Sequence, residues 1–179
     1  DLGNNSIGGE GCVALGKYLK GDKNLVWANF YMNDMGDKGA GEIAEALKSN
    51  KTLVHIDLGG NNIMATGAAK LGEMVQENEK LETMELSYNP MCPDGAKALA
   101  DALKFKGKVN ILKLGWCKLG VKGGSAIADA MRYNTSVHTL DLRGNGLGDE
   151  GVYDFAATLK VVNDTLERLD LGYNDIKDQ

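Results

Sequence analysis

The sequence has no long run of apolar residues, and this absence argues against a helix that crosses a lipid bilayer. It also shows no basic segment followed by an apolar one near its start, so we expect no secretory signal peptide. Arginine is scarce, and the 20 Lys and Arg together are outnumbered by 25 Asp and Glu. The net charge of −5 gives little support for contacts with phosphate backbones. We therefore predict neither nucleic acid nor membrane insertion for this chain.

Cysteine is also scarce. Cys12, Cys92 and Cys117 form no CxxC pair and have no histidine at the spacing of a metal ligand. Free thiols in a reducing compartment are favoured over disulfide or zinc chemistry, which predicts a cytoplasmic location.

What the sequence has in abundance is a repeated segment, of which 53–80 is a complete copy. Copies that are 28 residues apart open at Leu25, Leu53, Leu81, Val109 and Val137, and another opens at Leu166 after 29 residues. A fixed period of this length predicts a solenoid, in which each copy packs only against its neighbours.

Each copy has two halves with different periods. The first half is apolar at its first, fourth and sixth places, as in Leu53, Ile56 and Leu58, which predicts a short strand buried on one side. The second half is apolar at i, i+3, i+4 and i+7, as in 40–47 and 96–103, which predicts an amphipathic helix. Neither element is long enough to stand alone, so stacking of the copies must supply the core.

An asparagine column separates the two halves. It contains Asn5, Asn33, Asn61, Asn89, Asn145 and Asn174, with Cys117 in the fifth copy. The amide of each asparagine can satisfy the backbone groups of a buried turn and of the neighbouring copy. We therefore predict a structural role for this column.

The pattern LxxLxLxxN/C, followed by a helix that resembles GAxxLAxxL, is similar to the leucine-rich repeat. It most resembles the 28-residue class of ribonuclease inhibitor, the Ran GTPase-activating protein, tropomodulin and the sensor regions of NOD-like receptors. The resemblance implies an α/β solenoid, a curved right-handed β-α superhelix. Strands spaced about 4.8 Å apart lie on its concave face, and helices spaced about 8 to 10 Å apart lie on its convex face. Residues 1–179 form one such domain of about six to seven repeats.

The two ends and the turns carry further expectations. Asp1 falls in the middle of a strand and 166–179 supply a strand without a helix after it, which predicts seven strands, six helices and a fragment of a longer protein. Asn50, Asn78 and Asn134 are expected to end their helices in a left-handed turn.

Aspartates are expected to begin two of the helices. Asp37 and Asp149 each stand two residues ahead of a glycine that recurs in every copy, which makes them candidate helix N-caps.

Two motifs could carry chemistry, and the repeat explains both more simply. Residues 146–151 match GxGxxG, but Gly148 and Gly151 belong to glycine columns that recur through the copies. His55 and His138 lie on expected strands three copies apart, roughly 14 Å at the closest, too far to share a metal or a proton relay. We predict no enzyme activity, no metal and no cofactor.

The outward positions of the strands are the candidate binding surface. One column reads Asp1, Asn29, Asp57, Glu85, Lys113, Asp141 and Asp170. This acidic column would attract a basic protein surface, although a merely solvated face explains it equally well. Large side chains also fall at the strands and their ends, namely Trp27, Tyr31, Met32, Tyr88, Trp116 and Tyr173. They are expected to anchor a partner, the alternative being that they pack on one another across repeats.

These patterns predict a non-catalytic scaffold that binds a protein partner through its concave face or joins a larger assembly. The partner-binding residues predicted are Trp27, Tyr31, Asp57, Glu85, Tyr88, Trp116, Asp141, Arg143, Asp170 and Tyr173. The alternative implied by the resemblance is an enzyme regulator, acting on a GTPase or inhibiting a nuclease, or the sensor region of a NOD-like receptor.

Overall fold

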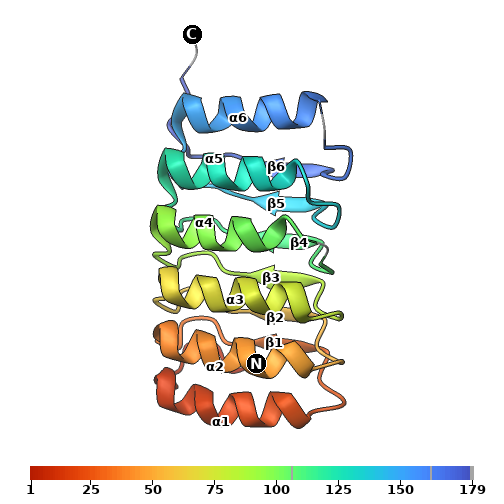
Figure 1. Cartoon of the computed structure of the whole chain (residues 1–179). Helices are drawn as coiled ribbons and strands as arrows, with labels where there is room; N and C mark the ends of the chain where they lie inside the picture. The colour runs from red at the N-terminus through yellow and green to blue at the C-terminus, as the bar shows by residue number, and fades with distance from the viewer. Residues whose placement is uncertain (106, 162, 178–179) are drawn as a thin grey trace.

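Strands and helices alternate in the computed structural model, which describes residues 1–105, 107–161 and 163–177 (Figure 1). Each complete repeat contributes a short strand, a turn and a helix, in the order that its two halves predict. The helices are α1 (Gly8–Gly21), α2 (Gly36–Ser49), α3 (Ala65–Glu77), α4 (Cys92–Leu103), α5 (Gly120–Met131) and α6 (Gly148–Val161). The strands are β1 (Trp27–Asn29), β2 (His55–Asp57), β3 (Thr83–Glu85), β4 (Ile111–Lys113), β5 (Thr139–Asp141) and β6 (Arg168–Asp170).

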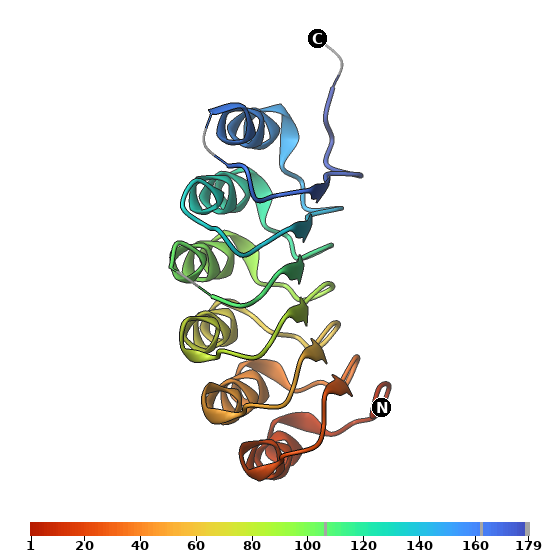
Figure 2. The same cartoon turned by 90° about the vertical axis from the view of Figure 1, so that its right-hand side faces the viewer.

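The strands form one parallel sheet in which each strand pairs with the strand of the next repeat. Ile56 of β2 lies opposite Ala28 of β1 and Met84 of β3, so the register follows the repeat. Figure 2 shows a shallow arc with the helices on its outer side and the strands on its inner side. Strands stack more closely than helices do, and this difference in spacing bends the solenoid. The predicted architecture is confirmed.

The core runs as a line between the sheet and the helices. Leu53, Ile56 and Leu58 of one repeat are at most 2% exposed, and Ile43 and Leu47 of α2 are fully buried. Burying an aliphatic side chain of this size contributes about 1.5 to 3 kcal/mol, so each repeat is held by its inward residues and its neighbours.

From Asn33 onward the asparagine column is a buried ladder of hydrogen bonds, as predicted, whereas Asn5 is exposed. The Nδ2 of Asn61 donates to the carbonyl oxygens of Leu58 (3.0 Å) in its own repeat and Phe30 (2.8 Å) in the preceding one. Its Oδ1 accepts the backbone N–H of Asn33 at 2.8 Å. One amide thereby satisfies backbone groups in two repeats, at a place where the residue itself is fully buried.

Cys117 occupies the same ladder, where its thiol is a weaker hydrogen-bond donor than an amide. Its thiol donates to the carbonyl oxygen of Leu86 at 3.3 Å, and its backbone N–H donates to Asn145 Oδ1 at 2.8 Å. Burial raises the pKa of this thiol to about 12, so it is protonated at neutral pH.

The asparagines at the helix ends do not adopt the left-handed turn that we expected, and that prediction is wrong. Asn50 and Asn78 are extended, with φ of −70° and −74°. Instead, their side chains hold the turn through hydrogen bonds to backbone groups. Asn50 Nδ2 donates to the carbonyl oxygen of Leu19 at 2.7 Å in the preceding helix, and its Oδ1 accepts the N–H of Leu53 at 2.8 Å. The same arrangement recurs at Asn78, Asn134 and Asn163, so a second asparagine ladder joins these helix ends to the strands that follow.

Neither aspartate is the N-cap residue of its own helix, because Asp37 and Asp149 lie within the first turns of α2 and α6, so this expectation is also corrected. Met35 is the N-cap residue of α2 and offers no side-chain bond. Asp37 Oδ1 instead accepts the N–H groups of Met64 (2.7 Å) and Gly67 (2.9 Å) at the start of α3. Asp149 accepts the N–H of Lys177 at 2.8 Å in the same way. Each carboxylate thus caps the turn of the following repeat, where stacked helix ends bring the free N–H groups close.

Six strands rather than seven are present among the described residues. The N–H of Leu2 still donates to the carbonyl oxygen of Asn29 at 2.9 Å, and that of Asn4 donates to Tyr31 at 2.7 Å. Residues 1–4 therefore extend the sheet on one side without forming a ladder long enough to be a strand.

Candidate functional site

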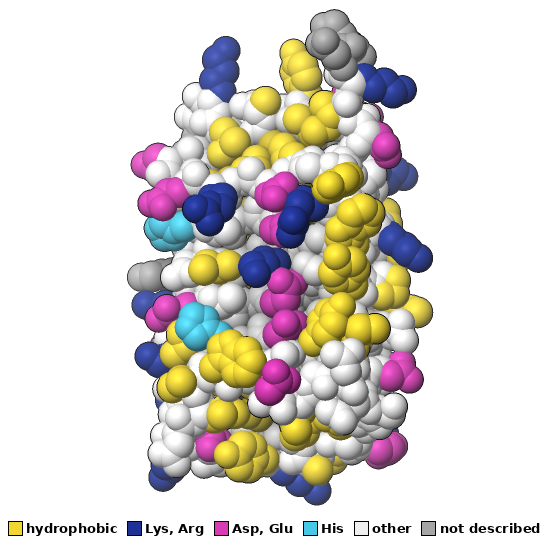
Figure 3. Space-filling view, turned by 180° about the vertical axis from the view of Figure 1, so that it is seen from behind, with side chains coloured by type: hydrophobic (Ala, Val, Ile, Leu, Met, Phe, Trp, Pro, Cys, Tyr) yellow, Lys and Arg dark blue, Asp and Glu magenta, His cyan; other side chains and the backbone are white. Residues whose placement is uncertain are grey.

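Strand-end carboxylates run along the middle of the concave face (Figure 3). Most of them accept the N–H of the residue two places on, which closes the turn after the strand. The bond from Gly59 N to Asp57 Oδ1 is 2.8 Å, and that from Ser87 N to Glu85 Oε1 is 2.7 Å. Asn29 does the same with its amide oxygen, at 2.8 Å from Tyr31 N. The turn needs an oxygen acceptor at this position and does not need a charge.

The charges of the carboxylates are compensated unequally. At the C-terminal end Arg143 binds Asp141 with two nitrogens, the shorter distance being 2.8 Å, and approaches Asp170 Oδ2 at 3.3 Å. In the middle, Lys113 Nζ lies 3.4 Å from Glu85 Oε2. Within the described part of the chain, Asp57 has no such ion pair.

Asp57 is half-buried and lies next to another carboxylate. Burial raises its pKa above the ordinary value, and repulsion from Glu85 adds to this rise, while Lys113 lowers it. The negative charge of Asp57 is therefore held at a cost to the folded state.

A hollow of about 390 Å³ opens over this part of the sheet. It is lined by Trp27, His55, Ile56, Asp57, Thr83, Glu85 and Lys113. Trp27 is 49% exposed, so about half of the surface of this residue is open to solvent beside the hollow. An aromatic wall beside two carboxylates favours a cationic guest.

Large side chains line one edge of the concave face, where the strands turn toward the helices. We call this row the aromatic edge, and its members are Met32, Tyr88, Trp116 and Tyr173. Their exposed fractions are 50%, 56%, 43% and 78%. All of them have a positive φ, between 52° and 62°, and Gly60 and Gly144 hold the same place in two other repeats. The left-handed backbone suits glycine and disfavours residues of this size.

The glycines make room for the large side chains beside them. A Cβ on Gly144 would lie 2.3 Å from the Trp116 ring, so this ring covers the backbone of the next repeat. The Trp116 and Tyr173 rings then meet across Gly144, with centroids 5.7 Å apart. For this pair the alternative of packing across repeats is correct, although both rings remain open to solvent.

The repeat geometry agrees with the comparison to known families. A family model described as Leucine Rich repeat matches more than half of the chain. It matches residues 1–16, 49–72, 77–100, 108–128, 133–156 and 162–179. The chain belongs to the leucine-rich repeat family. No curated protein matches the sequence significantly.

The solved structures that resemble this one include two leucine-rich repeat domains. The leiomodin-1 structure of Actin-Binding Site 2 has a TM-score of 0.65 and 18% identity, covering 81% of this chain and 87% of that chain. The tropomodulin C-terminal domain of Caenorhabditis elegans has a TM-score of 0.65 and 17% identity, covering 85% of this chain and 91% of that chain. At these identities the likeness shows the fold alone.

Six of the ten predicted binding residues fall into two groups on the leucine-rich repeat scaffold. The hollow brings together Trp27, Asp57 and Glu85, and the aromatic edge holds Tyr88, Trp116 and Tyr173. Tyr31 is half-buried against Gly59, so it offers less surface than its neighbour Met32.

The remaining three predicted residues, Asp141, Arg143 and Asp170, form the ion network at the C-terminal end. Asp141 is only 7% exposed beneath Arg143, and it therefore presents little surface to a partner.

Four residues that line the hollow were not among the predicted binding residues, namely His55, Ile56, Thr83 and Lys113. Three of them lie in columns that carried a signal, because His55 is in register with Trp27, Thr83 with His55, and Lys113 with Glu85. Ile56 belongs to the inward column that was predicted as core.

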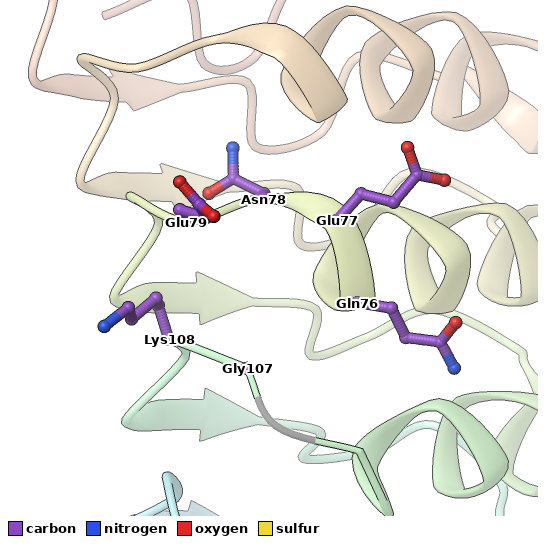
Figure 4. A pocket seen from close by; sticks show the side chains of 6 residues that line it. All are labelled: Gln76, Glu77, Asn78, Glu79, Gly107 and Lys108. Atoms are coloured by element: carbon purple, nitrogen blue, oxygen red, sulfur yellow. The ribbon is translucent and has the colours of Figure 1, made fainter.

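A larger hollow of about 580 Å³ lies beyond the end of α3, and Figure 4 shows that the side chains of Gln76, Glu77 and Lys108 point in different directions. Among the described residues, no three His, Cys, Asp or Glu side chains are grouped to hold a metal.

The cysteines are free thiols, as expected. Of the three cysteines only Cys92 is exposed to solvent. Burial raises the pKa of the Cys12 thiol to about 11, which makes its reactive thiolate form scarcer. None of the described helices is long and apolar enough to span a membrane.

Proposed function

We propose that this leucine-rich repeat domain is a non-catalytic module that holds a protein partner against its concave face and aromatic edge. The partner has a basic surface, and the module joins it to a larger cytoplasmic assembly. The observation that carries the proposal is the aromatic edge, where four large side chains occupy a left-handed backbone. Each costs about 1 kcal/mol or more relative to glycine, so a surface role explains their presence better than stability does.

The acidic column supports the basic character of the partner. Its carboxylates lie on the same face as the exposed Trp27, and the chain as a whole has a net charge of −5. Aromatic anchors beside a field of one sign are typical of a surface that attracts a complementary partner and then packs against it.

Purified actin is the first partner to test, because the similar leiomodin-1 structure is named for an actin-binding site. A pull-down from cytoplasmic extract with mass spectrometry follows if actin does not bind. The deciding variants are Trp27→Ala and Trp116→Ala, each expected to weaken partner binding by about 2 kcal/mol while the fold stays intact. Tyr153→Ala is the matched control, since Tyr153 is an aromatic residue of α6 that is 78% exposed. A partner that tolerates both tryptophan variants and loses affinity for the control would place the binding site on the helices.

The alternative functions stay predictions. A GTPase-activating role, a nuclease-inhibiting role and a receptor sensor role would all use the same scaffold. Assaying the partner's enzymatic activity with and without the module separates these roles from a scaffold that leaves the activity unchanged.

A further inference from the structure

We propose that the hollow between β1 and β3 receives the guanidinium of an arginine side chain from the protein partner, and this inference rests on the proposed function. Trp27 would stack on the planar guanidinium, and Asp57 with Glu85 would accept its N–H groups. The occupant is thus a basic segment of a partner with one arginine directed into the sheet.

The first argument is the shape and lining of the hollow. It has about 390 Å³ of open space, an apolar floor at Ile56 and an indole wall at Trp27. Trp27 opens β1, whereas Asp57 and Glu85 close the neighbouring strands β2 and β3. A side chain that enters here meets an aromatic face and two carboxylates together, which is the combination that arginine fits better than lysine.

The second argument is that Asp57 carries a charge the fold does not require. Asn29 stands in register with Asp57 and closes the same turn with its amide oxygen, at 2.8 Å from Tyr31 N. Asp57 makes the equivalent bond to Gly59 at 2.8 Å and keeps an unneutralised carboxylate. The turn alone would accept asparagine at both places.

The third argument is the distribution of internal cations. Arg143 covers Asp141 and approaches Asp170, so that end of the acidic column is already neutralised from within. Lys113 approaches Glu85 from one side only, at 3.4 Å, and is 44% exposed, so it can turn away when a guest arrives. Asp57, which lines the same hollow as Trp27, is therefore the carboxylate whose charge an incoming cation would neutralise.

The test is an NMR titration of the whole 179-residue chain with the tripeptide acetyl-Gly-Arg-Gly-amide, following the Trp27 indole and Gly59 amide signals. We expect saturable binding, with the neutral citrulline tripeptide at least about tenfold weaker because it lacks the charge. The lysine tripeptide should also bind more weakly than the arginine one. Absence of any shift at Trp27, or equal binding of the arginine and citrulline peptides, would overturn the proposal. Lysine binding as tightly as arginine would overturn the assignment to a guanidinium.

Matched variants locate the binding. Asp57→Asn keeps the turn bond and should weaken the arginine tripeptide about fivefold or more, since one charged partner is lost. Asp170→Asn makes the same chemical change in the same column at the neutralised end and should leave the affinity unchanged. Lys113→Gln removes the internal competitor of Glu85 and should tighten binding about twofold or more. Equal losses from the two aspartate variants would mean a general field effect and no defined site.

This titration can fail independently of the proposed function. If the partner needs Trp116 and the tripeptide does not bind, the protein-binding face stands and the arginine site falls. If the tripeptide binds and the partner is insensitive to variants of the concave face, the arginine site stands and the proposed function falls.

Discussion

Single side chains in this molecule often serve two repeats. Asn61 is fully buried, yet its amide bonds backbone groups of its own repeat and of the preceding one. Removing such a side chain leaves several buried polar groups without partners. This costs more free energy of folding than removing both partners of a hydrogen bond.

Asn61→Ala should therefore lower the free energy of unfolding by about 1 to 3 kcal/mol. Denaturant unfolding followed by circular dichroism measures this loss. Thr66→Ala on the exposed surface of α3 serves as the control and should change little. An Asn61 variant as stable as the parent would show that water replaces the ladder.

Asp57 gives a prediction for the effect of pH at the same scale. Its pKa is raised in the folded state by burial and by Glu85, so the folded chain binds this proton more tightly than the unfolded chain does. The contribution of Asp57 to stability is therefore most favourable below the ordinary aspartate pKa and falls as pH rises through the raised value. Relative to Asp57→Asn, the parent should lose stability across this acidic window. Unfolding measured from about pH 3 to pH 7 tests it, and a relative gain with rising pH would contradict the assigned cause.

At the scale of the elements, the turn from strand to helix has a backbone conformation that favours glycine, yet it carries large exposed side chains. The backbone there is left-handed in every repeat of the aromatic edge, with φ of 62° at Tyr88 and 64° at Gly60. Glycine adopts this conformation without steric cost, while tyrosine does not.

Tyr88→Gly should consequently leave the free energy of unfolding unchanged or raise it by up to about 1 kcal/mol, and should weaken partner binding. Thermal unfolding and a binding assay on the same sample separate the two effects. Tyr153→Gly within α6 should show the opposite behaviour, losing about 1 kcal/mol of stability and keeping the partner. A large loss of stability in the Tyr88 variant would mean that its ring supports the fold.

At the scale of the whole molecule, the curvature of the solenoid places the strand carboxylates on one concave face. The concave face gathers carboxylates from several repeats, so their field reaches beyond contact distance. Glu82 and Glu167 are exposed near this column and make no salt bridge among the described residues, which leaves their charges open to solvent.

Neutralising Asp57, Glu82 and Glu167 together should slow partner association and flatten its dependence on salt more than it changes dissociation. Stopped-flow association at about 50 and 200 mM salt measures both quantities. Asp57→Asn alone is the control that separates the local pocket effect, which acts mainly on dissociation, from the long-range effect. An association rate that ignores salt in the parent chain would remove the electrostatic argument.

The 28-residue period of the sequence is sufficient by itself to determine the fold, because a short strand and a short helix in each repeat can bury their apolar residues only by stacking. The sequence also determines which positions form the inward columns and the ladder of Asn61, because the same residue type recurs at the same position in several copies.

Contacts between repeats could not be found that way. Asp37 and Asn50 were assigned to turns of their own helices, yet they bond residues of adjacent repeats, at distances set only by how the elements stack. The sequence placed an acid in nearly every strand, but only the tertiary structure decided which carboxylates Arg143 neutralises and which one faces Trp27 across an open hollow. Charge compensation depends on distances of a few ångströms between side chains, and a repeat pattern does not contain those distances.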